Sequence, residues 1–145
     1  MKIAIGCDPK ATEYKATLIP FIENLGHEVV DFGSDDPIYA HTATALGEAV
    51  AAKECDRGIL ICGTGIGVCI AANKVRGVYA ADVNNIYQAE RATLSNNANV
   101  ITMGAQVTGI ELAKALVREY LKITFNENSR SAPKVSAILE YEQAH

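Results

Sequence analysis

Short, uniformly apolar runs alternate along the chain with longer segments in which apolar residues recur every three or four positions. A run without polar alternation is typical of a strand buried on both faces of a parallel sheet, whereas the longer period is typical of an amphipathic helix. The runs predict strands at 2–7, 28–32, 57–62, 78–81 and 99–103. The periodic segments predict helices at 12–25, 40–54, 68–73, 84–95, 109–121 and 133–143.

The regular succession of strand and helix predicts a parallel sheet with right-handed crossovers and helices on both faces. We expect an α/β fold, a Rossmann-like three-layer sandwich with a five-stranded parallel sheet and an additional C-terminal helix. Residues 1–125 would form this domain, and residues 126–145 a C-terminal extension. The last helix has no strand to return to, so its apolar residues need the chain's own sheet or a neighbouring subunit; we expect a neighbouring subunit. These residues are Val135, Ile138 and Leu139.

The chain has 145 residues, the size of one domain, and 49% of them are hydrophobic, enough for a packed core. Its 17 acidic and 13 basic residues give a net charge of −4, and no Lys/Arg cluster is dense enough to follow a nucleic-acid backbone. No apolar stretch approaches the roughly 20 residues of a membrane span, and the first residues do not form a secretory signal. We therefore expect a cytoplasmic protein that binds neither nucleic acid nor membrane.

The cysteines lack C-x-x-C spacing, and they are Cys7, Cys55, Cys62 and Cys69. In a reducing compartment we expect free thiols, not disulfides or zinc ligands. With only three histidines as further ligands, we expect no metal site. Cys7 ends a predicted buried strand and Cys69 lies one turn into an apolar helix, so both are expected to pack in the core.

A glycine-rich loop, Gly63-Thr-Gly-Ile-Gly67, directly follows the predicted strand 57–62 and leads into a short helix. Glycines permit positive φ, so backbone N–H groups can converge on an anion at the helix N-terminus. The spacing matches neither the G-x-G-x-x-G of dinucleotide folds nor a P-loop, which argues against a nucleotide site. Cys62 lies between the strand and the helix N-terminus, a position that stabilises a thiolate and suits a base. The alternative is that Cys62 is a small buried hydrophobic residue.

Other polar residues near the predicted strand ends each allow two interpretations. Asp8 follows the first strand, at the edge where parallel sheets bind ligands, and either contacts sugar hydroxyls or caps the next helix. Arg130 and Lys134 either clamp a phosphate or form a solvated helix face. A group of asparagines before the fifth strand either offers amides to a ligand or forms a turn. The group consists of Asn96, Asn97 and Asn99.

Together these residues resemble the ribose-5-phosphate isomerase type B and galactose-6-phosphate isomerase family over nearly the whole chain. The motifs that carry the resemblance are IAIGCD at 3–8, GHEVVDFG at 26–33, DRGILICGTGIG at 56–67, AANK at 71–74, NV at 99–100 and GIELAK at 109–114. The resemblance implies aldose–ketose isomerisation of a sugar phosphate through a cis-enediol, without metal or cofactor. It also implies a homodimer or a dimer of dimers, with sites shared between two subunits.

The same resemblance implies a role for individual residues. Cys62 matches the family's proton-abstracting cysteine, and Thr64 matches a threonine linked to ring opening. The loop that holds the enediolate matches Gly63, Gly65, Ile66 and Gly67. Sugar-contacting positions match Asp8, Tyr39 and Asn96, and two phosphate-binding arginines match Arg130 and Lys134.

The chain departs from the family pattern at several positions where a cationic residue is usual. The family usually has histidine at the positions of Pro9, Ser95 and Ser131. The histidine that Ser95 replaces is the ring-opening one. Arginine is common at the position of Gln106. We therefore expect poor turnover of ribose 5-phosphate and better turnover of another sugar, favouring one that is already open in solution, such as a tetrose phosphate. A hexose phosphate and an unphosphorylated sugar are the alternative substrates.

Two other functions are compatible with parts of the sequence. A flavodoxin-like binding module would use aromatic side chains to flank a ring, but the chain has no Trp and only 6% aromatic residues. One subunit of a heteromeric sugar-phosphate isomerase would explain the missing histidines, whereas the retained Cys62 argues against it.

Overall fold

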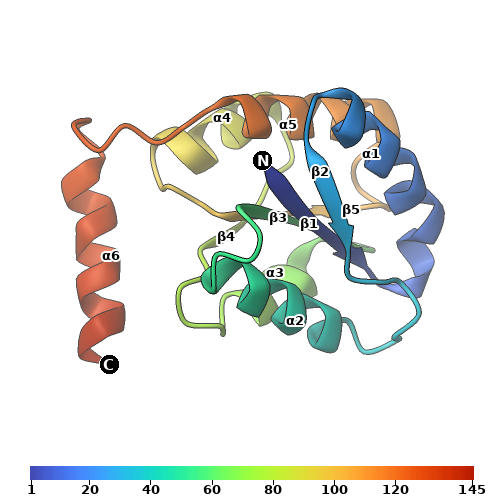
Figure 1. Cartoon of the computed structure of the whole chain (residues 1–145), viewed down its shortest axis with the longest axis horizontal. Helices are drawn as coiled ribbons and strands as arrows, with labels where there is room; N and C mark the ends of the chain where they lie inside the picture. Colours follow the sequence, from blue (N-terminus) through green and yellow to red (C-terminus); the bar gives the residue numbers. More distant parts are fainter.

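A computed structural model describes all 145 residues. Its centre is a five-stranded parallel sheet in the order β2-β1-β3-β5-β4 (Figure 1). The strands are β1 (Lys2–Cys7), β2 (Glu28–Asp31), β3 (Arg57–Cys62), β4 (Ala80–Asp82) and β5 (Val100–Gly104). The expected Rossmann-like sandwich with its additional C-terminal helix is confirmed.

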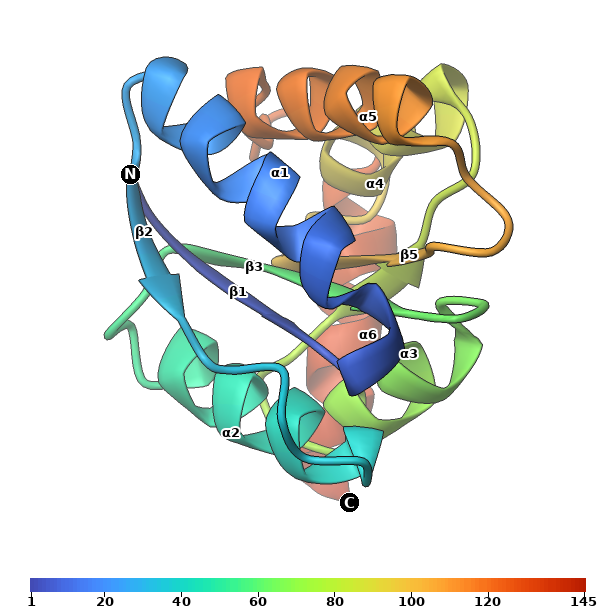
Figure 2. The same cartoon turned by 90° about the vertical axis from the view of Figure 1, so that its right-hand side faces the viewer.

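Two helical layers cover the sheet, as Figures 1 and 2 show. One layer contains α1 (Thr12–Asn24), α4 (Ile86–Leu94) and α5 (Ile110–Lys122), and the short helix η1 (Pro9–Ala11) precedes α1. The other contains α2 (Tyr39–Ala51) and α3 (Ile66–Ala72). Alternate side chains of β3 supply both layers: Ile59 and Ile61 belong to the first apolar cluster, Leu60 and Cys62 to the second. This two-sided burial explains why the inner strands β1, β3 and β5 are almost entirely apolar, whereas the edge strands β2 and β4 carry acidic residues.

Some element boundaries differ from those the sequence predicts, and local backbone geometry explains the differences. Helix α2 ends at Ala51 instead of 54, because Lys53 adopts a left-handed conformation with φ of 62°. Helix α3 begins at Ile66 instead of 68, directly after the left-handed Gly65. Strand β4 begins at Ala80 instead of 78, because the Tyr79 N–H donates to the Asn99 side chain at 2.8 Å.

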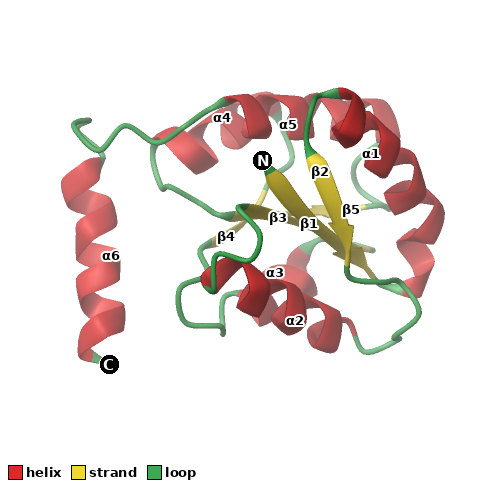
Figure 3. Ribbon diagram, in the orientation of Figure 1, coloured by secondary structure: helices red, strands yellow, loops and turns green.

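The C-terminal helix α6 (Ala132–Ala144) lies beyond the β4 edge, apart from both helical layers (Figures 1 and 3). It is held by Glu142, whose carboxylate accepts hydrogen bonds from the Gly77 N–H and the Tyr79 hydroxyl. Val135 is buried against its own chain, whereas Ile138 is 48% exposed. Helix α6 thus packs in part against the sheet edge of its own chain, and another part of the helix's apolar face stays exposed. None of the helices is both long and apolar enough to cross a membrane.

Candidate active site

A cavity of about 430 Å³ opens at the carboxyl ends of β1 and β3. It brings together most of the residues that the sequence singled out. Its lining consists of Asp8, Tyr39, Cys62, Gly63, Thr64, Ile66, Gly67 and Ile70. The glycine loop, the cysteine and the carboxylate therefore face one space, as ligand binding at this edge of a parallel sheet requires.

Cys62 is the cysteine that faces this cavity, although only 5% of it is exposed. Its Sγ accepts a hydrogen bond from the Gly65 N–H at 3.1 Å, a contact that stabilises a thiolate. Burial raises the pKa of Cys7 to about 11 and also raises the pKa values of Cys55 and Cys69, so these three remain thiols at neutral pH. Cys7 packs in the core as expected. The same expectation was wrong for Cys69, which is half-buried with Sγ 3.6 Å from the Ala80 carbonyl oxygen.

The conformation of the loop depends on Gly65, which has φ of +83°. A Cβ at this position would lie 2.6 Å from Asp82 Oδ1 and 2.8 Å from the Met103 carbonyl carbon, so a side chain has neither the φ nor the space. Gly65 does not itself line the cavity. It contributes the N–H that points at Cys62.

Two residues behind the loop were missed by sequence reasoning. The buried Thr102 donates from Oγ1 to the Gly65 carbonyl oxygen at 2.7 Å, and Asp82 Oδ1 lies 3.5 Å from the same hydroxyl. Burial raises the pKa of Asp82. Thr102 could have been found from the sequence as the polar residue inside the apolar strand β5, because a fully buried hydroxyl needs a specific hydrogen-bond partner.

Thr64 and Asp8 place polar oxygen atoms at the cavity. The Thr64 Oγ1 accepts the Ile66 N–H at 3.3 Å, which leaves the hydroxyl proton free to donate. Asp8 caps η1 by accepting the Lys10 N–H at 3.1 Å and also lines the cavity. Asp8 therefore caps the short helix η1 and not the predicted helix α1, whose N-cap is Ala11, and its carboxylate also faces the cavity.

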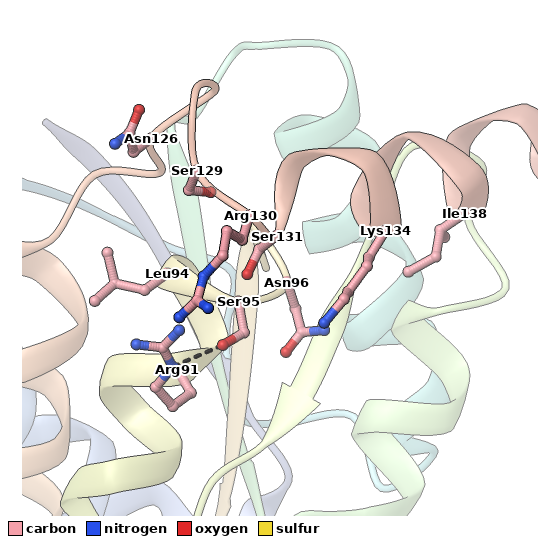
Figure 4. A pocket seen from close by; sticks show the side chains of 10 residues that line it. All are labelled: Arg91, Leu94, Ser95, Asn96, Asn126, Ser129, Arg130, Ser131, Lys134 and Ile138. Atoms are coloured by element: carbon pink, nitrogen blue, oxygen red, sulfur yellow. Dashed lines mark hydrogen bonds between the residues drawn. The ribbon is translucent and has the colours of Figure 1, made fainter.

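A second cavity, of about 940 Å³, lies between the end of α4 and the segment that leads into α6 (Figure 4). It contains Asn96, Arg130 and Lys134 and shares no lining residue with the Cys62 cavity. Its lining consists of Arg91, Leu94, Ser95, Asn96, Asn126, Ser129, Arg130, Ser131, Lys134 and Ile138.

The two cavities are at opposite ends of the sheet. Cys62 pairs with Gly104 at the carboxyl end of β5, whereas Asn96 precedes the amino end of that strand. Within one chain, Asn96 therefore does not share a cavity with Cys62. For Asn99 the interpretation as a turn residue is confirmed, because its side-chain amide accepts the Tyr79 N–H and donates to the Gly77 carbonyl oxygen.

Arg91 is a further residue that sequence reasoning missed. It stands one helical turn before Ser95, and its Nε donates to Ser95 Oγ at 2.6 Å (Figure 4). The i, i+4 spacing was the only signal, and it is a weak one.

The fold and the first cavity define a class of protein: an α/β protein with a cysteine and a glycine loop in a cavity at the carboxyl ends of its parallel strands. No three His, Cys, Asp or Glu side chains lie close enough to hold a metal ion. The model of the Ribose/Galactose Isomerase family matches residues 3–138, and the chain belongs to this family. It is an aldose–ketose isomerase of sugar phosphates.

Curated relatives match the chain over almost its full length. The D-erythrulose-4-phosphate isomerase 2 of Mycolicibacterium smegmatis is 44% identical over 99% of both chains. The D-erythrulose-4-phosphate isomerase of Pectobacterium atrosepticum is 45% identical over 98% of this chain and 95% of the relative. The ribose-5-phosphate isomerase B of Escherichia coli is 40% identical over 98% and 97%. The structure of ribose-5-phosphate isomerase B from Clostridium thermocellum superposes with a TM-score of 0.92, at 41% identity and 99% coverage of both chains.

Proposed function

We propose that this chain interconverts a tetrose phosphate and the corresponding ketose phosphate through a cis-enediol, with Cys62 as the base and no metal or cofactor. The observation that carries this proposal is the Gly65 N–H donated to Cys62 Sγ at 3.1 Å, inside a cavity lined by the glycine loop. The same backbone turn that stabilises the thiolate exposes N–H groups to a developing oxyanion.

The proposed reaction moves protons only. The Cys62 thiolate removes the proton from C2 of the aldose, the electron pair of that bond forms a C1=C2 double bond, and the carbonyl oxygen O1 becomes the enediolate oxygen. A proton then passes from the O2 hydroxyl to O1, and the Cys62 thiol returns its proton to C1. The product is the ketose, with its carbonyl at C2.

The other cavity residues have complementary roles in this scheme. The enediolate oxygen is held by the loop N–H groups other than those of Gly65 and Ile66, which already donate to Cys62 Sγ and Thr64 Oγ1. The Thr64 hydroxyl, with its proton free, suits transfer between O1 and O2. Asp8 and Tyr39 would hold the sugar hydroxyls from the opposite wall.

The four-carbon substrate is supported by the departures from the family pattern. A tetrose phosphorylated at O4 has no free hydroxyl with which to close a five- or six-membered ring, so it needs no ring-opening histidine. At position 95 the chain has a serine whose hydroxyl is already bonded to Arg91. Relatives at 44% and 45% identity carry the name D-erythrulose-4-phosphate isomerase.

We further propose that the complete site forms between two copies of the chain, in a homodimer or a dimer of dimers. The Cys62 cavity has no cationic lining residue for a phosphate, and the cavity with Arg130 and Lys134 lies at the other end of the sheet. A second copy would bring its phosphate cavity to the first copy's Cys62. The half-exposed Ile138 of α6 supports such a contact.

A substrate panel tests this function. The purified single chain is assayed with four-, five- and six-carbon aldose and ketose phosphates, and proton NMR in D₂O follows conversion and exchange at C1 and C2. We expect the highest kcat/KM for the tetrulose phosphate. Ribose 5-phosphate as the best substrate would overturn the four-carbon assignment. Inactivity of the single chain with all of them would favour the heteromeric subunit instead.

A further inference from the structure

The cavity at the end of α4 concentrates positive charge in an acidic protein. Arg91, Arg130 and Lys134 all line it, and its lining contains no Asp or Glu, although the chain as a whole has a net charge of −4. Figure 4 shows both guanidinium groups turned toward Ser95. Like charges that converge repel one another, and of the three only Arg91 has a carboxylate nearby, that of Glu90, so a bound anion would stabilise the arrangement.

The donors of Arg91 are divided in a way that suits an anion. Its Nε donates a hydrogen bond to Ser95 Oγ at 2.6 Å, and this bond fixes the orientation of the guanidinium plane. Its Nη1 forms a partly exposed ion pair with the Glu90 carboxylate at 3.6 Å, a distance too long for a hydrogen bond, so both terminal nitrogens keep N–H groups that can donate to a ligand. Neither Arg130 nor Lys134 takes part in any ion pair of the chain.

We infer that Arg91 is a third cationic ligand of the substrate phosphate, and that Ser95 is a positioning residue that holds its guanidinium toward the phosphate. This inference rests on the proposed function. A phosphate monoester carries a charge of about −1.5 to −2 at pH 7, and a guanidinium fork can bind two of its oxygens at once. Arg91 thus restores part of the charge that the departures from the family pattern remove.

The first test compares Arg91→Gln with the parent protein on two forms of the same sugar, the tetrulose 4-phosphate and the unphosphorylated tetrulose. We expect KM for the phosphorylated form to rise about ten- to a hundredfold with little change in kcat, because one charge-assisted contact is lost. The kcat/KM for the unphosphorylated form stays unchanged, and inhibition by inorganic phosphate weakens by a similar factor.

The matched control is Arg118→Gln. It removes one positive charge from α5, where the guanidinium packs on the Phe21 ring at 5.1 Å, and Arg118 lines neither cavity. We expect it to leave KM unchanged, which separates a local contact from a general loss of charge. Arg91→Lys, which keeps the charge but not the fork, should give an intermediate KM.

The positioning role of Ser95 is tested by a double-mutant cycle. Ser95→Ala should raise KM for the phosphorylated sugar several-fold, Ser95→Thr should recover most of this loss, and Ser95→Ala should have no further effect in the Arg91→Gln background. Additive effects of the two substitutions would overturn the positioning role.

The outcomes separate this inference from the function on which it rests. Suppose that the parent protein turns over the tetrulose phosphate and that Arg130→Gln raises KM for it. An unchanged KM in Arg91→Gln would then overturn the role of Arg91 alone. An unchanged KM with weakened self-association would assign Arg91 to a subunit contact and also overturn it. A parent protein that does not discriminate between the two forms of the sugar would overturn the phosphate site itself.

Discussion

The Tyr39 ring lies directly against the backbone of Gly67, so that a Cβ on Gly67 would be 2.5 Å from the Tyr39 Cζ and 2.8 Å from its hydroxyl oxygen. Tyr39 is the first residue of α2, and Gly67 lies in the first turn of α3. The N-terminal ends of two helices therefore meet at the wall of the Cys62 cavity, and the absence of a side chain at 67 allows this approach.

We expect Gly67→Ala to displace the Tyr39 ring and to lower kcat/KM by about two orders of magnitude, because a shift of about 1 Å in a substrate contact is enough for such a loss. Gly109→Ala is the control, since a Cβ there meets nothing within 4 Å. Steady-state kinetics of both variants check this. A Gly67→Ala enzyme as active as Gly109→Ala would contradict the role of the close approach.

Thr102→Val should loosen the glycine loop without changing the shape of the core. It removes the donor to the Gly65 carbonyl oxygen and leaves that buried acceptor unpaired, at a cost of about 1–3 kcal/mol in the free energy of unfolding. We expect kcat to fall about tenfold as the loop N–H groups lose their orientation. Thr102→Ser keeps the hydroxyl, so it should retain the parent's free energy of unfolding, measured by urea denaturation, and the parent's kcat, measured by steady-state kinetics. Equal behaviour of the two variants would rule out this hydrogen bond as the cause.

Cys62→Ala should abolish isomerisation while the fold and the assembly stay intact, because it removes the proposed base and leaves only a small cavity. A positioned base contributes about 10²–10⁴-fold to such a reaction. Cys7→Ala and Cys69→Ala should keep substantial activity. Loss of C2-proton exchange in D₂O, followed by NMR, measures the effect. A Cys62→Ala protein with a tenth of the parent turnover would mean that another group is the base.

Asp31→Asn should destabilise the fold in a pH-dependent way. The Lys15 side chain is only 5% exposed, and its Nζ lies 2.6 Å from Asp31 Oδ1. Burial acts to raise the pKa of Asp31, but hydrogen bonds from Lys15 and the Gly33 N–H lower it below its ordinary value of 3.8. Because the folded-state pKa is the lower one, the carboxylate stabilises the fold above this value and stops doing so as the pH falls through the folded-state pKa.

At pH 7 we expect Asp31→Asn to lower the free energy of unfolding by about 1–2 kcal/mol, a value reduced by solvent screening of the partly exposed carboxylate. Urea denaturation of both proteins between pH 7 and pH 3 measures the difference, which should shrink once the pH is below about 4. A difference that stays constant over this range would exclude the ion pair as its source.

Subunit mixing tests whether each site uses two chains. Cys62→Ala and Arg130→Gln should each be impaired alone, one in the base and the other in the phosphate contact. In a hybrid dimer one site carries both changes and the other carries neither, so random mixing should restore about a quarter of the parent activity. Light scattering at micromolar concentration should detect no monomer. Failure of mixed subunits to regain activity, with exchange verified by mass, would place each complete site within one chain.

The amino-acid sequence by itself determined the alternation of strands and helices and the local constellation at the end of β3. These features depend on short-range patterns: uniformly apolar strands, helical periodicity, and a cysteine followed immediately by a glycine loop. Cys62, Gly63 and Gly67 are consecutive or nearly so, and their placement follows once β3 and α3 are recognised.

Only the tertiary structure decided where Asn96, Arg130 and Lys134 lie relative to Cys62. Their separation depends on which end of β5 each segment meets and on how α6 is anchored, and no local period encodes either fact. The anchor itself joins Glu142 to Gly77, 65 positions apart in the chain. Such contacts form because a buried or half-buried polar group must find a partner wherever the fold brings one. The pairing of Arg91 with Ser95 in one cationic cavity became visible for the same reason.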